Sequence, residues 1–464
     1  MASTSGGIAL ADEIEEAIAA AFPEPGSLFA TEDQLRPRHG TGRSTVRQAA
    51  RILEQRGVAY MKRGVGGGLI VMEPDPEPVG RMLAIVIGSR LGNFFDMLRL
   101  VKATDATVLP SGIGGLDLAE CDGIRAMADK MEAMAADEFS QERAHWHLLR
   151  RALGALGNPA TLLAYHTWME CNADLIPFSM NVSETRRRGE YWALTLQAIE
   201  ALVAGDISSL FEFRNRQIRF AVDWHAWRGM ESHRPLTPSL NSPNLVDVTA
   251  GRHGADRLSR ELLHEIRLRR WEPDAHLGGF SELMERYGVS SAMLRQATRM
   301  LEECSTVYTK PGRGGGVFIG DCSPEVPIRR ATNYLKQARV PAEDIRTFLT
   351  QILLECLSQI PDRATSHRIE QVRDGFALAA RQKPGIIAPE LVMAIGQASG
   401  NAALSIWVEV LMKALPQQRR RHIPDIDLNP CFDALAESIA AYDTGRARRA
   451  LIQLTRSADL VGMA

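Results

Sequence analysis

Four polar side chains lie at the start of one predicted helix, in the stretch GRSTVRQAARILE that begins at Gly42. They are Arg43, Ser44, Thr45 and Arg47. Side chains in the first turn of an exposed helix can reach phosphates and base edges, and the helix dipole favours anions there. An arginine can also bind guanine through two parallel hydrogen bonds. These residue types at this spacing therefore indicate recognition of double-stranded DNA.

The residues around this helix start are strongly basic. Between Arg36 and Arg63 the chain has eight Lys or Arg residues and one acid, Glu54. A basic hairpin tip follows, and its glycines leave no side-chain bulk to prevent close approach to a DNA backbone or minor groove. Surface arginines are commonly just solvated, but here the order of elements favours DNA binding. The candidate DNA-binding residues of this segment are Arg36, Arg38, Arg43, Ser44, Thr45, Arg47, Lys62, Arg63 and Gly66.

Three local elements must position these residues. A short helix is expected from Glu32 to Leu35, followed by the turn HGTG and by a helix that Ser44 and Thr45 open. The apolar face of the second helix comprises Val46, Ala49, Ala50, Ile52 and Leu53. The stretch VAYMKRGVGGGLIVM then predicts a β-hairpin. The pattern is a helix-turn-helix whose second helix would enter the major groove.

A second copy of the same layout follows about 250 residues later, in SSAMLRQATRMLEECSTVYTKPGRGGGVFI from Ser290 to Ile319. Matching segments keep an offset of 244 to 249 residues, which predicts duplication of a whole unit. The second copy has five basic residues and three acids between Met284 and Arg313. Its candidate DNA contacts are Arg295, Lys310 and Arg313. It is either a weaker, different DNA reader or a head retained for architecture.

The bulk composition is that of a helical globular chain of several domains. The 464 residues are 45% hydrophobic and 24% charged, and the net charge of −2 indicates neither a nucleic acid nor a membrane partner by itself. Six scattered cysteines, no long apolar run and acids near the N-terminus predict a cytoplasmic protein with no membrane partner. The expected fold is mainly α, with two winged helix-turn-helix heads and two all-α bundles in tandem. The predicted domains are a first head at 1–75, a first bundle at 76–232, a linker at 233–252, a second head at 253–322 and a second bundle at 323–464.

Residues 8 to 73 resemble the winged-helix head of the GntR superfamily. The family pattern is E-x-x-L, then S-R-[TS]-T-V-R-x-A-x-x-x-L-x-x-x-G, then a wing of R-x-G-x-G-x-[FY]-V type. Gly42 replaces the usual Ser, and Asp33 stands where the family often has Arg, a contact that Arg36 or Arg38 could replace. The residues that match are Glu32, Leu35, Arg43, Ser44, Thr45, Val46, Arg47, Ala49, Leu53, Gly57, Arg63, Gly66 and Val71.

The long helical regions resemble the effector domain of the FadR-type branch, the FCD domain, at ALGALGNPATLL and AIGQASGNAALS. Many members of that branch hold a divalent metal through an Asp and three His. The corresponding positions here are His145, Leu149, Ala388, Val392, Thr195 and about Leu435, so we expect no metal and no other cofactor.

The resemblance leaves the ligand of the bundles open. Arg99 and Arg346 occupy equivalent places and could hold the carboxylate of a small organic acid, although a solvated arginine is the commoner case. His145 is a further candidate for binding an effector. An apolar or aromatic effector and a purely structural bundle are the alternatives.

The expected function is a sequence-specific DNA-binding transcription regulator, a repressor tuned by a small metabolite. The tandem chain would form a covalent pseudo-dimer with the first head dominant in DNA contact, and it could also form a homodimer. One alternative is a helical interaction scaffold without specific DNA binding. Another is a GntR-type chain fused to an aminotransferase-like domain that uses pyridoxal phosphate. Lys336, Lys383 and Lys413 lie in helical or turn segments, so no Schiff-base lysine is visible and no enzyme activity is expected.

Overall fold

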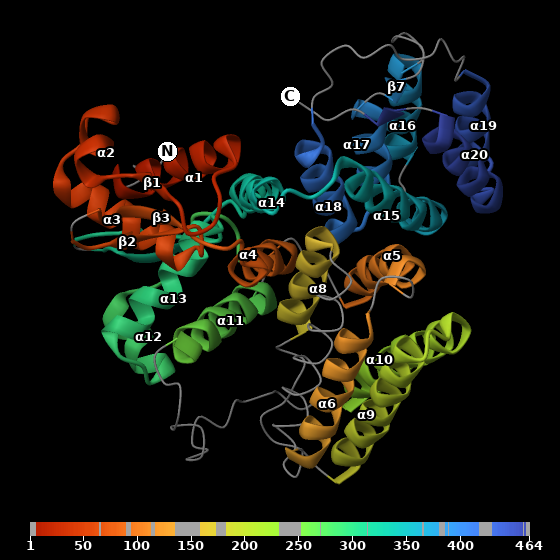
Figure 1. Ribbon diagram of the computed structural model, residues 1–464, viewed down its shortest axis with the longest axis horizontal. Coiled ribbons are helices and arrows are strands. Elements are labelled where there is room, and N and C mark those ends of the chain that lie inside the picture. The colour runs from red at the N-terminus through yellow and green to blue at the C-terminus, as the bar shows by residue number, and fades with distance from the viewer. Residues whose placement is uncertain are drawn as a thin grey trace.

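The computed structural model places two small heads beside a larger helical body (Figure 1). The structure describes residues 6–64, 66–89, 94–112, 117–134, 158–172, 182–231, 252–269, 271–312, 314–363, 366–379, 386–387, 389–416, 429–457 and 459–460. These residues are mostly helical, and their two larger sheets are small and antiparallel. The prediction of a mainly α chain with small sheets is confirmed.

The first head is a winged helix-turn-helix. Apolar side chains on α1, α3 and the sheet meet in one core cluster, in which Ile14, Leu35, Leu53 and Leu69 are almost completely buried. The three strands pair antiparallel in the order β1-β3-β2, so the hairpin predicted from the sequence gains a third strand. The elements are α1 (Gly6–Ala21), β1 (Leu28–Ala30), α2 (Glu32–Arg38), α3 (Arg43–Gln55), β2 (Ala59–Lys62) and β3 (Gly68–Val71).

The second head repeats this order of elements. Its strands pair antiparallel in the order β4-β6-β5, and Lys310 pairs with Gly316 as Lys62 pairs with Gly68 in the first head. The turn at the tip of each wing also has the same backbone. Gly64 and Gly66 have φ of 99° and 73°, and Gly312 and Gly314 have φ of 96° and 74°. The elements are α11 (Arg252–Arg269), β4 (His276–Gly278), α12 (Phe280–Tyr287), α13 (Ser291–Glu303), β5 (Val307–Lys310) and β6 (Gly316–Ile319).

Helices of both halves of the chain make up the body. The first half contributes α4 (Pro76–Ser89), α5 (Phe94–Gly112), α6 (Leu118–Met134), α8 (Pro159–Asn172), α9 (Val182–Val203) and α10 (Ile207–Glu231). The second half contributes α14 (Glu325–Gln337), α15 (Ala342–Arg363), α16 (Ser366–Ala379), α17 (Pro389–Ala398), α18 (Ala402–Ala414), α19 (Asn429–Ala440) and α20 (Thr444–Ser457). A two-residue parallel pair, β7 (Ile386–Ile387) with β8 (Asp459–Leu460), was not expected from the sequence.

Two asparagines of the repeated Gly-Asn motif start corresponding helices. Asn158 Oδ1 accepts a hydrogen bond from the backbone N–H of Ala160 at 3.0 Å, at the start of α8. Asn401 Oδ1 accepts one from the N–H of Leu404, also at 3.0 Å, at the start of α18. Each side chain satisfies an N–H group that the helix itself leaves unpaired. The motif therefore marks the same kind of helix start in both halves.

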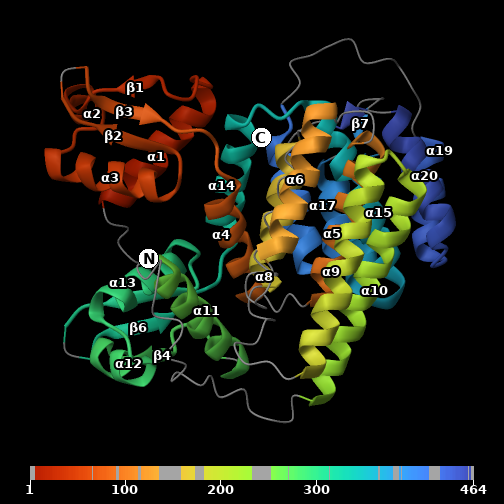
Figure 2. The same cartoon turned by 60° about the horizontal axis from the view of Figure 1, so that its bottom comes forward.

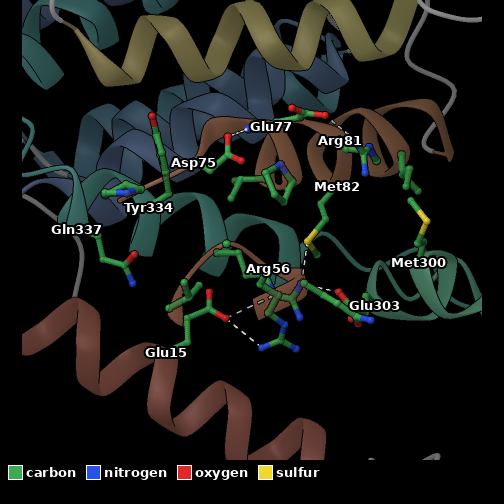
Figure 3. Close-up of a pocket in the computed structure, with 18 of the residues that line it drawn as sticks. Glu15, Arg56, Asp75, Glu77, Arg81, Met82, Met300, Glu303, Tyr334 and Gln337 are labelled. Atoms are coloured by element: carbon green, nitrogen blue, oxygen red, sulfur yellow. Dashed lines mark hydrogen bonds and ion pairs between the residues drawn. The ribbon is translucent and has the colours of Figure 1, made fainter. Parts of the chain in front are cut away.

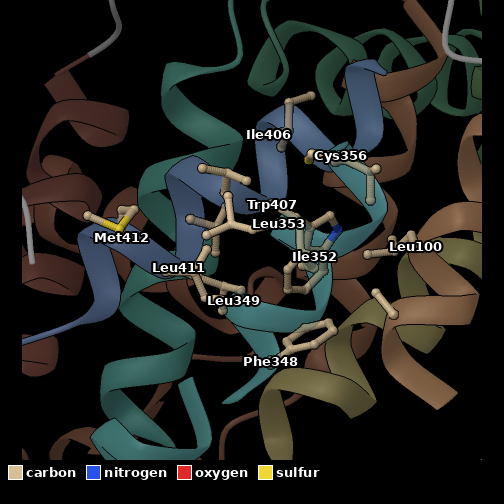
Figure 4. Packing of buried hydrophobic residues seen from close by; sticks show 14 of the residues in the cluster. Leu100, Phe348, Leu349, Ile352, Leu353, Cys356, Ile406, Trp407, Leu411 and Met412 are labelled. Carbon is tan, nitrogen blue, oxygen red and sulfur yellow. The ribbon is translucent and has the colours of Figure 1, made fainter. Parts of the chain in front are cut away.

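The two helical halves share one hydrophobic core. A single cluster of buried residues runs from Leu83, Met97 and Leu100 in the first half to Phe348 and Trp407 in the second. Figure 4 shows Leu100 facing this cluster next to Phe348 and Trp407, whose ring centroids are 5.7 Å apart. This cluster therefore contains residues of both predicted bundles, while α5, α6, α9 and α10 of the first half form a further cluster around Leu109, Ile199 and Leu202.

The helices that follow the heads cross over to the opposite head. Helix α14, which follows the second head, packs against α1 of the first head. Helix α4, which follows the first head, packs against α11 and α13 of the second, and its Met82 and Ile85 belong to the second head's core cluster. Figures 1 and 2 show α4 and α14 between the heads and the body. Each head is therefore held by a helix from the other half of the chain.

No described helix is long and apolar enough to cross a membrane.

Candidate nucleic-acid interface

Helices α2 and α3 present the first turn of α3 to solvent. The hydroxyl of Thr31 accepts a hydrogen bond from the N–H of Gln34, and the Gln34 side chain accepts one from the N–H of Thr31, which closes a capping box. Leu35 is 1% exposed and anchors α2 against the core. Gly42 precedes α3 without a side-chain cap, so the first N–H groups of α3 have no side-chain acceptor at that position. A helix end of this kind favours anionic partners.

One glutamate holds both predicted base-reading arginines. The Nε of Arg43 lies 2.7 Å from Oε1 of Glu32, and the Nε of Arg47 lies 3.5 Å from Oε2 of the same side chain. The Arg43 and Arg47 side chains are 60% and 59% exposed, so their charges face solvent. Glu32 therefore orients two arginines side by side at the start of α3. In the sequence, Glu32 is recognisable only as part of the E-x-x-L pattern, which does not indicate this role.

The remaining predicted residues of the first head are also accessible. Ser44 is exposed and Thr45 is half-buried, and both lie in the first turn of α3. Arg36, Arg38, Lys62, Arg63 and Gly66 are exposed. Arg36 lies 3.9 Å from Asp33, a weak surface ion pair that leaves its guanidinium available. The predicted residues of this head therefore lie on α2, in the first turn of α3 and on the β2–β3 wing, and all except the half-buried Thr45 are exposed.

The start of the second recognition helix, α13, is different in character. The hydroxyl of Ser290 caps it by accepting a hydrogen bond from the N–H of Met293 at 3.3 Å. Arg295 is exposed and lies over the ring of Phe280, 5.8 Å from its centroid. Lys310 lies over Tyr308 and Phe318, whose rings stack with centroids 5.5 Å apart. Arg313 lies outside the described residues. In this head a serine therefore caps the recognition helix, and the described candidates Arg295 and Lys310 lie over aromatic rings.

The two effector candidates in the described residues, Arg99 and Arg346, are each paired with a glutamate. Arg99 in α5 pairs with Glu355 in α15 at 3.1 Å, so its charge is already met across the two halves. Arg346 pairs with Glu343, one turn earlier in its own helix, at 3.3 Å. His145 lies outside the described residues. Neither arginine stands in the described part of the chain as an unpaired anchor for an organic acid.

A buried polar network in the first helical half was missed by the sequence analysis. The Nη2 of Arg214 in α10 lies 3.0 Å from Oδ2 of Asp105 in α5, and the side chains are 7% and 6% exposed. The Tyr165 hydroxyl donates to the same carboxylate. Arg214 also donates to Gln217 at 2.7 Å, and Gln217 donates to Thr195 at 2.8 Å. Sequence periodicity does not reveal such a network, because its members lie far apart in the chain.

The ionisation states in this network follow from burial and charge. Burial and the nearby Asp105 carboxylate raise the pKa of Tyr165 well above its ordinary value. Burial alone would lower the pKa of Arg214, but the Asp105 carboxylate, Tyr165 and Tyr191 together raise it above its ordinary value. Tyr165 is therefore a neutral donor and Arg214 a permanent cation at neutral pH, which is the arrangement of a structural ion pair.

The positions that correspond to the family's metal ligands and lie in the described residues carry no His or Asp side chain. Thr195 belongs to the network above, Leu435 is buried and apolar, and Val392 is buried in α17. His145, Leu149 and Ala388 lie outside the described residues. Within the described part of the chain there is no group of three or more His, Cys, Asp or Glu side chains that could hold a metal ion.

Comparison with known proteins identifies the second head. Residues 255–317 match the model of the gntR family of bacterial regulatory proteins. This stretch runs from α11 to β6, so the second head is a gntR-type helix-turn-helix domain. No curated protein matches the chain. The sequence analysis had placed the more specific resemblance in the first head, whose exposed arginines are absent from the start of α13.

Three solved structures are among those similar to the chain. A Streptococcus agalactiae GntR is 17% identical over 44% of this chain and 98% of its own, with a TM-score of 0.31. A transcriptional regulator GntR from Rhodococcus sp. RHA1 is 18% identical over 47% and 96%, with a TM-score of 0.23. The Listeria monocytogenes protein Lar, described as controlling the agr system, is 16% identical over 48% and 99%, with a TM-score of 0.20. TM-scores of this size do not establish a common fold, so the similarity to the gntR family rests on residues 255–317.

Proposed function

We propose that this chain is a sequence-specific DNA-binding transcription regulator of the gntR family in which the first head dominates DNA contact. The observation that carries the proposal is the exposed pair Arg43 and Arg47, which Glu32 holds side by side at the start of α3. Two oriented arginines there can reach base edges in a major groove. The gntR-type second head supports a regulator of this class over an unrelated helical scaffold.

The tandem arrangement supports a covalent pseudo-dimer. Single-head regulators dimerise to read two-fold symmetric operators, because a palindrome mirrors the symmetry of the protein. Two heads with the same element order in one chain supply a comparable pair, but their side chains differ, so the protein would read an asymmetric operator. A homodimer that pairs two first heads would restore symmetry.

The resemblance of the helical halves to FCD domains supports a repressor of the FadR type. In such a repressor the helical body would sense a metabolite. The buried Asp105–Arg214 pair lies in the first of these halves. Since both charges of this pair are met internally, a structural role for the network is favoured over an effector site. An effector, where one binds, would be a small organic acid or an aromatic compound.

A DNA-binding assay on the promoter region flanking the protein's own gene tests the proposal. Wild type and the double variant Arg43→Ala/Arg47→Ala are compared at two salt concentrations with excess competitor DNA. Each lost base contact should cost about 1–3 kcal/mol, or roughly 5- to 150-fold in affinity. The matched control is Arg446→Ala/Arg449→Ala on exposed positions of α20, which removes the same charge away from the heads.

The results of this assay distinguish a transcription regulator from an interaction scaffold. Competitor-resistant binding that is lost in the head variant and kept in the control variant supports the regulator. Equal binding by all three proteins, or binding that competitor abolishes, favours the interaction scaffold. Adding Arg295→Ala to the comparison decides whether the second head reads bases or only supports the first.

A further inference from the structure

The two recognition helices are linked through one buried charged cluster. We call Asp12, Glu15, Arg56, Glu303 and Arg330 the joint cluster. Arg56 caps the C-terminal end of α3, and its Nη1 lies 2.7 Å from Asp12 and 3.0 Å from Glu15, both in α1. Glu303 is the last residue of α13, and its Oε2 lies 2.7 Å from Nη1 of Arg330 in α14. The cluster therefore lies at the ends of both recognition helices.

Arg330 is the member that joins the two heads. Besides Glu303 of the second head, it faces the first head, with Nε 3.9 Å from Glu15 and Nη2 4.0 Å from Asp12. Its side chain is 4% exposed. Burial alone would lower the pKa of Arg330, but the carboxylates of Glu303, Glu15 and Asp12 raise it above its ordinary value. Arg330 is thus a fixed cation between carboxylates of two different heads.

The surroundings of Arg330 leave room for movement. It lines a cavity of about 630 Å³ between the heads and the helices α4 and α14. Figure 3 shows Glu15 and Arg56 of the first head and Glu303 of the second gathered at this cavity, with Met82 and Arg81 of α4 beside them. Apolar side chains, among them Val58, Val79 and Ile85, line the cavity together with these charged groups.

The two heads are attached in different ways. Met82 and Ile85 of α4 belong to the apolar core cluster of the second head, and the Cys304 thiol donates to the carbonyl of Met82 at 3.9 Å. In the described residues, the buried core cluster of the first head contains only residues from 10 to 71. Ion pairs tie the first head to α14, where Arg329 pairs with Asp12 at 2.7 Å. Ion pairs fix direction as well as distance, whereas apolar contacts are non-directional.

We propose that Arg330 is a positioning residue that holds the first head at a fixed distance and orientation from the second. It thereby sets the spacing between the DNA half-sites that the protein accepts. The effect on half-site spacing rests on the proposed function, while the fixed distance and orientation of the heads concern the protein without DNA. Removing Arg330 leaves Glu303 without its partner at 2.7 Å, while Arg56 and Arg329 still pair with the acids of α1. The first head then loses its charged link to the second head.

The first experiment measures the distance between the heads in the absence of DNA. Spin labels on non-canonical amino acids replace the exposed residues Arg51 in α3 and Ala292 in α13 of the full chain. Wild type should give one narrow distance distribution by pulsed electron resonance, and Arg330→Met a broad one. The matched control is Arg346→Met on α15, which loses its pair with Glu343 in the same helix, away from the heads, and should stay narrow.

The second experiment selects DNA from a library in which two half-sites are separated by variable lengths. Wild type should enrich one spacing, because a shift of about five base pairs places half-sites on opposite faces of the duplex. Arg330→Met should enrich several spacings while it keeps the base preference of the first half-site. Arg330→Lys retains the charge and should restore part of the single spacing.

The outcomes are distinguishable. A distribution in Arg330→Met as narrow as in wild type overturns the positioning role, whatever the DNA result. If wild type selects no DNA, the proposed function fails, but the label distances still decide the role of Arg330. If Arg330→Met does not fold, Glu303→Gln is measured in its place. This substitution keeps the shape of the side chain and removes its charge. A narrow distribution in that variant also overturns the role.

Discussion

The buried ion pair between Asp105 and Arg214 gives a quantitative test of how the first helical half is held together. It joins α5 to α10, with Nη2 and Oδ2 3.0 Å apart and both side chains almost completely buried. Arg214→Met removes the cation and leaves the carboxylate in the interior with the Tyr165 hydroxyl as a donor. Removing one partner of a buried pair costs about 3–5 kcal/mol, because the remaining charge is desolvated without compensation.

The double variant Asp105→Leu/Arg214→Met gives the opposite expectation. Replacing a whole buried pair by apolar side chains of similar size is commonly neutral or stabilising. We therefore expect the double variant to lie within about 1 kcal/mol of wild type in its free energy of unfolding, while each single variant loses about 3–5 kcal/mol. Arg216→Met is the matched control in the same helix, since Arg216 is exposed. It should change the free energy by less than about 1 kcal/mol.

Urea denaturation followed by tryptophan fluorescence measures these changes, and hydrogen exchange of the α10 amides reports the local part. The reasoning is refuted if the single variants lose less than about 1 kcal/mol, which would mean that water compensates the remaining charge. It is also refuted if the double variant loses the sum of the two single losses, because the energy would then come from packing and not from the pair.

Three further predictions concern the heads and the core. Glu32→Gln should strengthen binding to random DNA but lower the ratio of specific to non-specific affinity, because Arg43 and Arg47 lose the carboxylate that orients them; competition binding at two salt concentrations measures both. Burial raises the pKa of Cys356 from 9.0 to about 12, so the folded state keeps a proton that the unfolded state loses. The stabilisation that the protonated thiol provides is fully present below pH 9, and the free energy of unfolding falls by about 2–3 kcal/mol between pH 9 and pH 11. A Cys356→Ala variant should lack this pH dependence in urea titrations. Gly67→Ala should weaken DNA affinity and lower the thermal stability of the first head, because its Cβ would lie 2.4 Å from the backbone carbonyl oxygen of Lys62 and the wing turn would have to shift; an unchanged affinity would argue against a wing contact.

The heads were predictable from the sequence because their determinants are local. The apolar period of α3, the turn before it and the glycines of the wing all lie within a few residues of the structure that they specify. The third strand of each sheet was not foreseen. β1 is only Leu28–Ala30 and β4 only His276–Gly278, too short for an alternating pattern, and both depend on pairing with a distant strand.

The organisation of the body was harder to predict because it depends on contacts between distant residues. Periodicity marks Leu100 and Trp407 as buried, but it does not say that they share one cluster across 300 residues of chain. In the same way, Arg99 was an effector candidate because its partner Glu355 could not be known. The roles of Glu32 and Arg214 were not predicted. Each role depends on contacts with other side chains and not on a sequence motif.

The crossing of α4 and α14 also matters while the protein is being made. Met82 and Ile85 find their apolar partners in the second head, whose last strand ends at Ile319. Translation at about 5–20 residues per second separates these segments by roughly 10–50 s. During that interval the first half has an apolar helix without its partner and an incomplete core. The nascent chain therefore depends on chaperone protection or on slow compaction, and neither half is expected to be a soluble product when expressed alone.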